Sequence, residues 1–197
     1  WPQPSSAPGG TAYFCTRDGK GQAVSLIQSN YHGIGSGRSA GDTGVFLHDR
    51  GRGFNLIPGH PNELGPGKRP LHTLSPTLWT DGDAARLILG TRGGQYQPQI
   101  LVQVAAALLH SRLSPGKSQE RPRWLVDGWG PGEDPVVRVE DRFQPAATTG
   151  LHQRGHQVEV TGGYQEGWGP VSLIDISTAG VEGSADPRVS TSHAAAG

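Results

Sequence analysis

Apolar and polar residues alternate in two short runs near the start of the chain, Thr11–Thr16 and Ala23–Ser29. Alternation with a period of two is typical of a β-strand that buries one of its faces. The residues between the runs, Asp18-Gly19-Lys20-Gly21, have the composition of a tight turn. The pattern therefore predicts a β-hairpin in this part of the chain.

A helical pattern replaces the alternation in the middle of the chain. From Pro98 to Ser111, apolar residues recur three and four positions apart, behind a proline that suits the first turn of a helix. A weaker amphipathic pattern predicts a second helix over Ala146–Arg154, ended by Gly155. Further apolar runs predict short strands at Gly44–His48, Leu78–Thr80, Ala85–Leu89, Pro135–Glu140, Gln157–Val160 and Val171–Ile176.

Segments rich in turn-forming residues separate these elements. Gly33–Arg38 is a glycine-rich loop, and Arg50–Pro70 is a long stretch interrupted by prolines. Loops of that length inside a compact domain are usually functional or disordered. We expect residues 1–10 to form a flexible leader, Pro115–Arg123 to be a polar connection, and the tail after Arg188 to fray.

The order of the predicted elements indicates an α+β fold over residues 11–197, with helices on the face of a largely antiparallel sheet. Two hairpins, then one or two helices and further strands, do not give the regular βαβ alternation of a doubly wound parallel sheet. A length of 197 residues suits one domain of medium size.

Composition excludes several classes of protein. Lys+Arg and Asp+Glu are 17 each, so no net charge attracts nucleic acid or an anionic membrane. No apolar stretch approaches the ~20 residues that span a bilayer, and a single cysteine excludes an internal disulfide. The lone cysteine and the lack of an Asn-x-Ser/Thr pattern fit a bacterial cytoplasm. Because the chain has no methionine and begins with Trp1, we expect it to be a piece of a longer precursor.

Several familiar kinds of site are poorly supported. The cluster Gly33-Ile34-Gly35-Ser36-Gly37 lacks the G-x-G-x-x-G spacing of a dinucleotide site. His152 and His156 are four apart, but Gly155 lies between them and no third ligand follows. Neither Ser36 nor Ser184 stands in a G-x-S-x-G elbow. The sequence thus predicts no metal ion and no organic cofactor.

Two residues remain as candidate nucleophiles. Cys15 lies inside a predicted strand, where a lone cysteine is more often a small buried side chain than a nucleophile. Thr11 opens the first strand directly after the leader. A threonine hydroxyl becomes nucleophilic when a base is within reach, and the free α-amine of the same residue is such a base. That chemistry requires cleavage of the Gly10–Thr11 bond; otherwise Thr11 is an ordinary strand residue.

Four blocks of residues stand in order along the chain, at spacings that are specific as a set. They are Gly10-Thr11 with Gln22–Asn30 and Gly35-Ser36-Gly37; Pro58–Asn62 with Pro66–Leu71 and Leu74-Ser75-Pro76; Gly90, Gly93-Gly94 and Gln97-Pro98-Gln99; and Pro122-Arg123 with Ala185-Asp186-Pro187-Arg188. In these blocks the chain resembles the small, C-terminal subunit of the γ-glutamyltranspeptidase family of N-terminal-nucleophile hydrolases, from Thr11 to about Arg188. The resemblance implies half of a four-layer αββα sandwich, completed by a large subunit from the same precursor.

The resemblance also implies roles for particular residues. Thr11 matches the nucleophile that autocatalytic cleavage frees, and Ser29 matches a hydroxyl that hydrogen-bonds it. Gly93 and Gly94 match the pair whose backbone N–H groups form an oxyanion hole, where a side chain would obstruct the substrate. Asn30 falls among the substrate-binding positions. The expected reaction is hydrolysis or acyl transfer of a small-molecule amide, of γ-glutamyl or glutaryl type.

The chain departs from the transpeptidase pattern where that family binds the α-amino and α-carboxylate groups. Arg50 and Gly53 replace the glutamine and aspartate that hold the amino group, and Arg50 would repel an ammonium. His72 and Thr73 replace paired serines and can still donate hydrogen bonds. These changes favour an acylase-type donor without a free α-amine. The alternative is a processing-defective, non-catalytic homologue, in which Gly10 still blocks the amine of Thr11.

Overall fold

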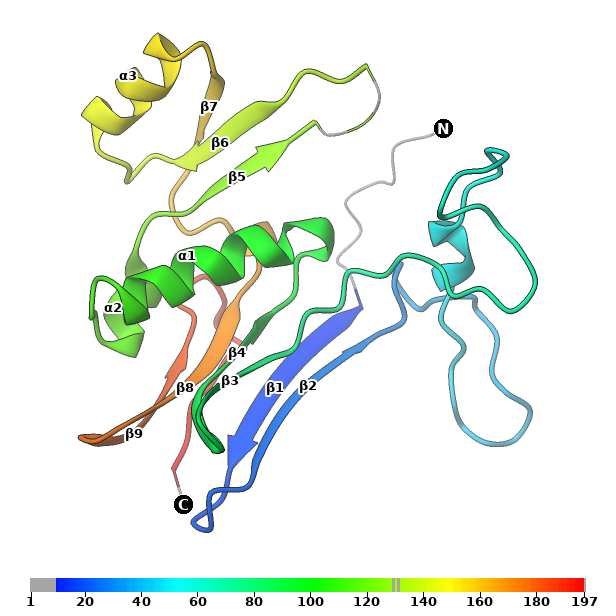
Figure 1. Ribbon diagram of the computed structural model, residues 1–197, viewed down its shortest axis with the longest axis horizontal. Helices are drawn as coiled ribbons and strands as arrows, with labels where there is room; N and C mark the ends of the chain where they lie inside the picture. Colours follow the sequence, from blue (N-terminus) through cyan, green and yellow to red (C-terminus); the bar gives the residue numbers. More distant parts are fainter. Residues whose placement is uncertain (1–9, 129, 131, 197) are drawn as a thin grey trace. The chain divides into compact units, whose positions relative to one another are not determined.

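The computed structural model describes residues 10–128, 130 and 132–196, and the chain divides into two compact units. The first unit comprises residues 10–12 and Ile27–Leu74, and the second comprises Tyr13–Leu26 and the described residues from Ser75 onward. Figure 1 shows the elements in chain order. Residues 1–9 of the predicted leader lie outside the described residues.

The predicted hairpin is confirmed. Strands β1 (Thr11–Arg17) and β2 (Ala23–Ser29) form a two-stranded sheet in which half-buried and exposed residues alternate along both strands. The Asp18 carboxylate closes the turn by accepting the backbone N–H groups of Lys20 at 2.9 Å and Gln22 at 2.8 Å. The alternation read from the sequence therefore corresponds to the burial that the strands adopt.

A four-stranded antiparallel sheet forms the centre of the second unit, with strand order β3-β4-β8-β9. Its strands are β3 (Thr77–Asp81), β4 (Ala84–Thr91), β8 (Val171–Ser177) and β9 (Gly180–Ala185). Helix α1 (Gln97–Leu109) lies across one face of this sheet (Figure 1). Burial of apolar surface between helix and sheet is the main stabilising contribution of the unit. The core consists of Leu87, Leu89, Ile100, Leu101, Val104, Ala105, Leu108, Leu125, Trp168, Val171 and Leu173.

A second sheet has the order β5-β6-β7 and includes one parallel pair. Its elements are β5 (Trp124–Asp127), β6 (Val136–Glu140), α3 (Pro145–Gln153) and β7 (Gln157–Thr161). Helix α3 makes the crossover that a parallel connection between β6 and β7 requires. Gln99 and Gln103 of α1 satisfy the outer edge of β5: each side chain donates to a carbonyl and accepts an N–H, at Val126 and Trp124 respectively.

The structure confirms the α+β class, the two hairpins and helix α1, and corrects other expectations. Gly44–His48 is not a buried strand: only an isolated bridge joins Ser39 to Phe46, and Val45, Phe46 and Leu47 are exposed. Pro115–Arg123 is not wholly an irregular connection, because α2 (Pro115–Glu120) begins after a Ser114 cap. Among the described residues, no helix has the length and apolarity needed to cross a bilayer.

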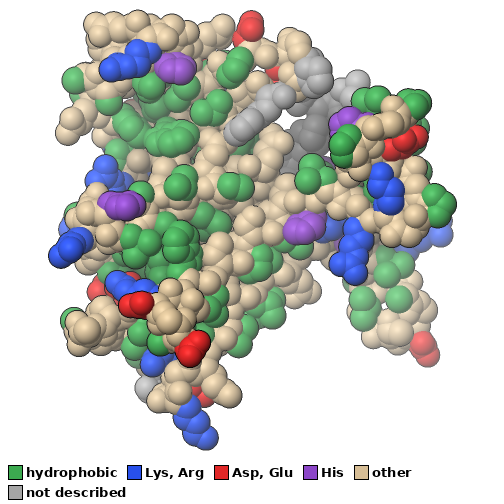
Figure 2. All heavy atoms as spheres, in the orientation of Figure 1, with side chains coloured by type: hydrophobic (Ala, Val, Ile, Leu, Met, Phe, Trp, Pro, Cys, Tyr) green, Lys and Arg blue, Asp and Glu red, His purple; other side chains and the backbone are tan. Residues whose placement is uncertain are grey.

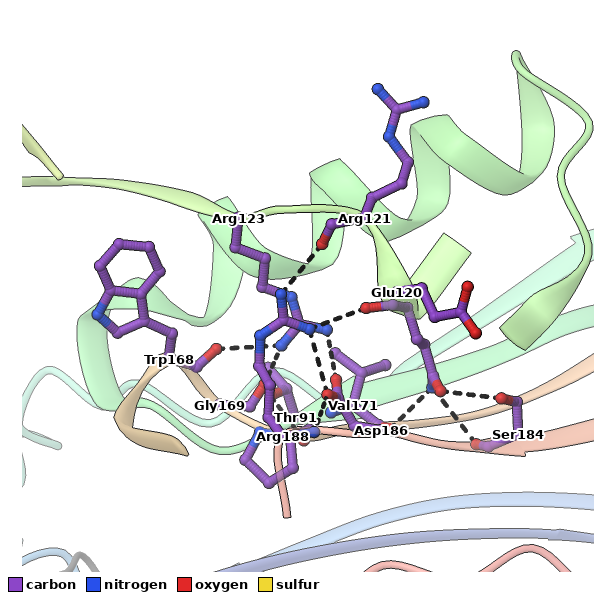
Figure 3. A network of polar contacts seen from close by, with 12 residues as sticks. Thr91, Glu120, Arg121, Arg123, Trp168, Gly169, Val171, Ser184, Asp186 and Arg188 are labelled. Atoms are coloured by element: carbon purple, nitrogen blue, oxygen red, sulfur yellow. Dashed lines mark hydrogen bonds and ion pairs between the residues drawn. The ribbon is translucent and has the colours of Figure 1, made fainter. Parts of the chain in front are cut away.

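A buried network of charged groups joins the two sheets of the second unit (Figure 3). Glu140, at the end of β6, is fully buried and accepts hydrogen bonds from Arg188 at 2.8 and 2.9 Å and from Arg142 at 2.6 Å. Burial alone would raise the pKa of this carboxyl, but the hydrogen bonds and charge of Arg188 outweigh burial and lower it. The carboxylate is therefore held ionised.

Glu140→Gln should destabilise the full-length protein by about 3 kcal/mol at pH 7, because it leaves buried guanidinium groups without their counterion. The lowered pKa of Glu140 means that its contribution is present above the unfolded-state pKa, about 4.3, and is lost as the pH falls through the folded-state value. Unfolding of wild type and variant at pH 7 and pH 3.5 measures this. The difference in the free energy of unfolding between wild type and Glu140→Gln should be smaller at pH 3.5 than at pH 7. An unchanged difference would contradict the assignment of Glu140 as an ionised carboxylate.

Candidate active site

Thr11 and Ser29 meet at the ends of the hairpin strands, where β1 begins and β2 ends. The Thr11 hydroxyl donates to Ser29 Oγ at 2.8 Å, and the backbone N–H of Tyr31 donates to the same oxygen at 3.0 Å. Tyr31 can do so because its backbone turns sharply after the strand, with φ of 78°. Ser29 is thereby fixed as the neighbour of the Thr11 hydroxyl, as the resemblance leads us to expect.

The peptide bond before Thr11 lies against the glycine-rich loop. A Cβ at Gly10 would collide with the backbone carbonyl of Gly33. Gly35 of the same loop approaches equally closely, since its Cβ would lie 2.6 Å from the carbonyl oxygen of Leu47. Gly10 and Gly35 thus each stand where the backbone of another segment approaches too closely for a side chain.

Asp49 organises the loop that follows. Its carboxylate accepts the backbone N–H of His32 at 3.1 Å and lies 3.3 Å from His32 Nδ1. Its own N–H donates to the carbonyl of Asn30 at 3.2 Å. Sequence reasoning did not single out Asp49 or Tyr31. The signal for Tyr31 is the turn directly after strand β2, where backbone and side-chain groups compensate one another. Asp49 follows no strand, and the sequence pattern carries no such signal for it.

Arg50 is the most unusual residue of this unit. It is only 7% exposed, its guanidinium carbon lies 5.2 Å from the centre of the Tyr31 ring, and its Nη1 has no hydrogen-bond partner among the described residues. Burying an unpaired cation is costly, so such a group is expected to meet an anion. Arg50 also follows Asp49 in the chain, and the backbone N–H of Asp49 bonds the carbonyl of Asn30, so Asn30 and Arg50 lie near each other.

His72 and Thr73 belong to the same unit, on its last loop. The loop is held next to η1 (Arg50–Gly53), because a Cβ at Gly53 would lie 2.8 Å from the carbonyl oxygen of Leu71. His72 Nδ1 accepts the backbone N–H of Leu74 at 3.2 Å, which leaves Nε2 as its other hydrogen-bonding atom.

Gly93 and Gly94 lie in the second unit, between β4 and α1. Both have positive φ angles, 128° and 56°, which favour glycine over any residue with a side chain. Gly94 opens the short helix η2 (Gly94–Tyr96), where the first N–H groups have no partner within the helix. The turn can therefore present backbone donors, which is what an oxyanion hole needs.

Cys15, the other candidate nucleophile, and Tyr13 are residues of β1 that belong to the second unit. Burial raises the pKa of the Cys15 thiol, which disfavours the reactive thiolate. Burial likewise raises the pKa of Tyr13, whose hydroxyl lies 2.8 Å from Ser25 Oγ. A Cβ at Gly90 of β4 would collide with three carbon atoms of the Tyr13 ring. No group of three or more His, Cys, Asp or Glu residues that could hold a metal lies within the described ranges.

Comparisons with known proteins identify the same family that the sequence resembles. The family model described as gamma-glutamyltranspeptidase matches residues 2–196. A glutathione hydrolase-like YwrD proenzyme from Bacillus subtilis is 40% identical over 182 residues, 90% of this chain. An oxamate amidohydrolase proenzyme from Klebsiella pneumoniae is 38% identical over 192 residues, 96% of this chain. The chain spans 34% and 36% of the lengths of these two relatives.

Solved structures give the same result for the fold. The crystal structure of cephalosporin acylase from Bacillus halodurans superposes with a TM-score of 0.80 and 36% sequence identity, covering 94% of this chain and 34% of that one.

Proposed function

This chain belongs to the gamma-glutamyltranspeptidase family, and on that premise we propose that it carries the nucleophile of an amide hydrolase or acyltransferase. Residues 11–197 are its catalytic domain and residues 1–10 precede the processing site. Once the Gly10–Thr11 bond is cleaved, the freed α-amine takes the proton of the Thr11 hydroxyl while Oγ1 attacks the amide carbonyl of the substrate. The observation that carries this proposal is the hydrogen bond from the hydroxyl of Thr11, the residue directly after Gly10, to Ser29 Oγ.

The reaction continues through a threonyl ester. The N–H groups of Gly93 and Gly94 stabilise the negative oxygen of the tetrahedral intermediate, and the leaving amine departs with the proton taken from Thr11. Water or an acceptor amine then attacks the ester and restores the hydroxyl. The test is mass spectrometry of the mature full-length protein during turnover of an anilide substrate. An acyl adduct on the peptide that begins with Thr11 supports the proposal; turnover with an adduct on Cys15 alone refutes it.

The substrate side of the site favours an anionic acyl donor without an α-amine. The buried Arg50 guanidinium, whose Nη1 has no hydrogen-bond partner in the described part of the chain, suits a donor carboxylate and would repel an ammonium. Asn30, His72 and Thr73 supply further polar contacts to that donor. Two relatives are named for oxamate and cephalosporin substrates, which is consistent with donors other than glutathione.

The mature protein should hydrolyse glutaryl p-nitroanilide with at least about tenfold higher kcat/KM than γ-glutamyl p-nitroanilide. Arg50→Gln should lower kcat/KM for the glutaryl substrate about 10–100-fold, the value of one charge-assisted hydrogen bond. Arg52→Gln is the matched control, because Arg52 is 55% exposed and only pairs with Asp49 at 3.6 Å. A strong preference for the γ-glutamyl substrate would contradict the assignment of Arg50.

A large segment of the same precursor is the proposed partner of this chain. Large apolar side chains are exposed on the surface of this chain, and Figure 2 shows hydrophobic side chains on the face that it draws. Exposed apolar surface of this kind indicates a covering partner. We propose that the partner completes a four-layer αββα sandwich, of which this chain supplies half. The most exposed of these residues are Ile34, Ile57, Leu56 and Leu71.

A further inference from the structure

The loop at residues 166–170, here called the backing loop, lies directly against the strand end that leads to Gly93. Gly169 in this loop has φ of +65°, and a Cβ there would lie 2.6 Å from Thr91 Oγ1 and collide with the carbonyl oxygen of Arg92. A Cβ at Gly93 would in turn lie 3.8 Å from Gly169 Cα. The backbone of the loop therefore approaches the glycine turn closely, and the Ile100 side chain lies beside both Gly93 and Gly169.

Polar contacts fix the same two segments to each other. The buried Thr91 hydroxyl donates to the carbonyl of Pro170 at 2.9 Å. Arg92 Nη2 donates to Glu166 Oε1 at 3.0 Å. Any displacement of the backing loop is thereby transmitted to the two residues that precede Gly93.

Arg123 holds the backing loop from its other side (Figure 3). Its Nη1 donates to the carbonyls of Gly169 at 2.6 Å and Trp168 at 3.2 Å, and its Nη2 pairs with Asp186. Asp186 also accepts the backbone N–H of Val171 at 2.9 Å, at the start of β8. One guanidinium thus fixes two successive carbonyls, and its counterion fixes the strand that follows them.

The charge of Arg123 is maintained although the side chain is only 2% exposed. Burial lowers its pKa to about 10, and the charge of Asp186 opposes that shift, so the guanidinium stays protonated at neutral pH. A buried ion pair adds little net stability over apolar side chains of similar volume. The contribution of Arg123 here is geometric, because a planar guanidinium donates its hydrogen bonds in fixed directions to both carbonyls.

We propose that Arg123 is a positioning residue for the Gly93–Gly94 turn, acting through the backing loop. Arg123 touches no substrate; it sets the orientation of the backbone donors through the carbonyls of Trp168 and Gly169. The inference rests on the proposed function, in which that turn stabilises the oxyanion. A displacement of about 1 Å in such donors is expected to reduce the chemical step by up to about a hundredfold.

The first experiment compares Arg123→Gln and Arg123→Lys in the full-length precursor, with kcat counted per mature Thr11 terminus found by mass spectrometry. Arg123→Gln should lower kcat about 30–100-fold with KM changed less than threefold. Arg123→Lys, which keeps one donating charge, should recover part of the loss. Arg188→Lys is the control for disturbance of the shared buried network, because Arg188 bonds Asp186 and Glu140, as Arg123 does, but donates to no residue of the backing loop.

Two further variants, at Gly169 and Gly167, test the proposal if the arginine variants fold poorly. Gly169→Ala places a methyl group against Arg92 and Thr91, whereas a Cβ at Gly167, two residues earlier, meets nothing within 4 Å. Gly169→Ala should lower kcat per mature terminus at least about tenfold, and Gly167→Ala should leave kcat within about twofold of wild type.

The outcomes separate this inference from the proposed function. If Arg123→Gln and Arg188→Lys lose kcat only in proportion to their melting temperatures, or if Gly169→Ala keeps full kcat, Arg123 is merely structural and the positioning role is refuted. Wild-type turnover through an acyl adduct on Thr11 would still support the proposed function. If the wild type shows no such adduct, the proposed function fails first and the inference fails with it.

Discussion

Thr11→Ala should abolish turnover, with kcat falling by about 10⁴-fold or more, because the variant loses the one hydroxyl that the described residues place beside Ser29 Oγ. The same variant should leave the Gly10–Thr11 bond intact, since the hydroxyl that attacks that bond is missing. Thr11→Ser keeps the hydroxyl and its 2.8 Å contact with Ser29 Oγ, and should retain both processing and activity within about a hundredfold of wild type.

Release of p-nitroaniline and the mass of the processed chain measure both effects. Thr16→Ala is the control on the same strand, because Thr16 is an exposed position of β1. It should leave processing and kcat within about twofold of wild type, as surface substitutions usually do. Turnover by Thr11→Ala at more than about one hundredth of the wild-type rate would rule out Thr11 as the nucleophile.

Gly90→Ala should severely reduce folding and activity. Gly90 is buried in β4, and its added Cβ would collide with the ring of Tyr13, two residues after the proposed nucleophile. We expect a loss of about 3 kcal/mol in the free energy of unfolding, at the upper end of overpacking effects. Activity should fall at least about tenfold, because relief of the clash displaces either β1 near Thr11 or β4 before Gly93.

The double variant Gly90→Ala, Tyr13→Ala identifies the cause. Removing the ring vacates the space that the new methyl group needs, so the double variant should be more stable than Gly90→Ala alone, a coupling of about 1 kcal/mol or more. Gly183→Ala in β9 is the control, since its Cβ meets only Ala194 Cβ at an ordinary 3.5 Å. Additive effects of the two substitutions would show that the ring is not the obstacle.

The regular elements were predictable where periodicity and burial coincide. The alternation in β1 and β2 and the helical spacing in α1 corresponded to the faces that these elements bury or half-bury. Strand β9, with the sequence Gly-Val-Glu-Gly-Ser-Ala, has almost no β-forming residues and is specified by its pairing with β8. Conversely, Val45, Phe46 and Leu47 look like a core strand in sequence but are exposed in the structure.

The candidate site was predictable only as far as the resemblance reached. It led to Thr11, Ser29 and the glycine pair, and the contact between Thr11 and Ser29 is present. It did not lead to the buried Arg50 Nη1, which lacks a partner within residues 10–128, 130 and 132–196, or to the contact of Arg123 with the Gly169 carbonyl. Both depend on which buried polar groups find partners in the folded chain, and residue spacing carries no information about that.

The state of the Gly10–Thr11 bond tests the central claim most directly. The measurement is N-terminal sequencing and intact mass of this chain, isolated from its full-length precursor after prolonged incubation. The account predicts a new terminus that reads Thr-Ala-Tyr-Phe, starting at Thr11. A chain that still reads through Gly10 would have no free amine on Thr11, and would contradict the proposed N-terminal nucleophile.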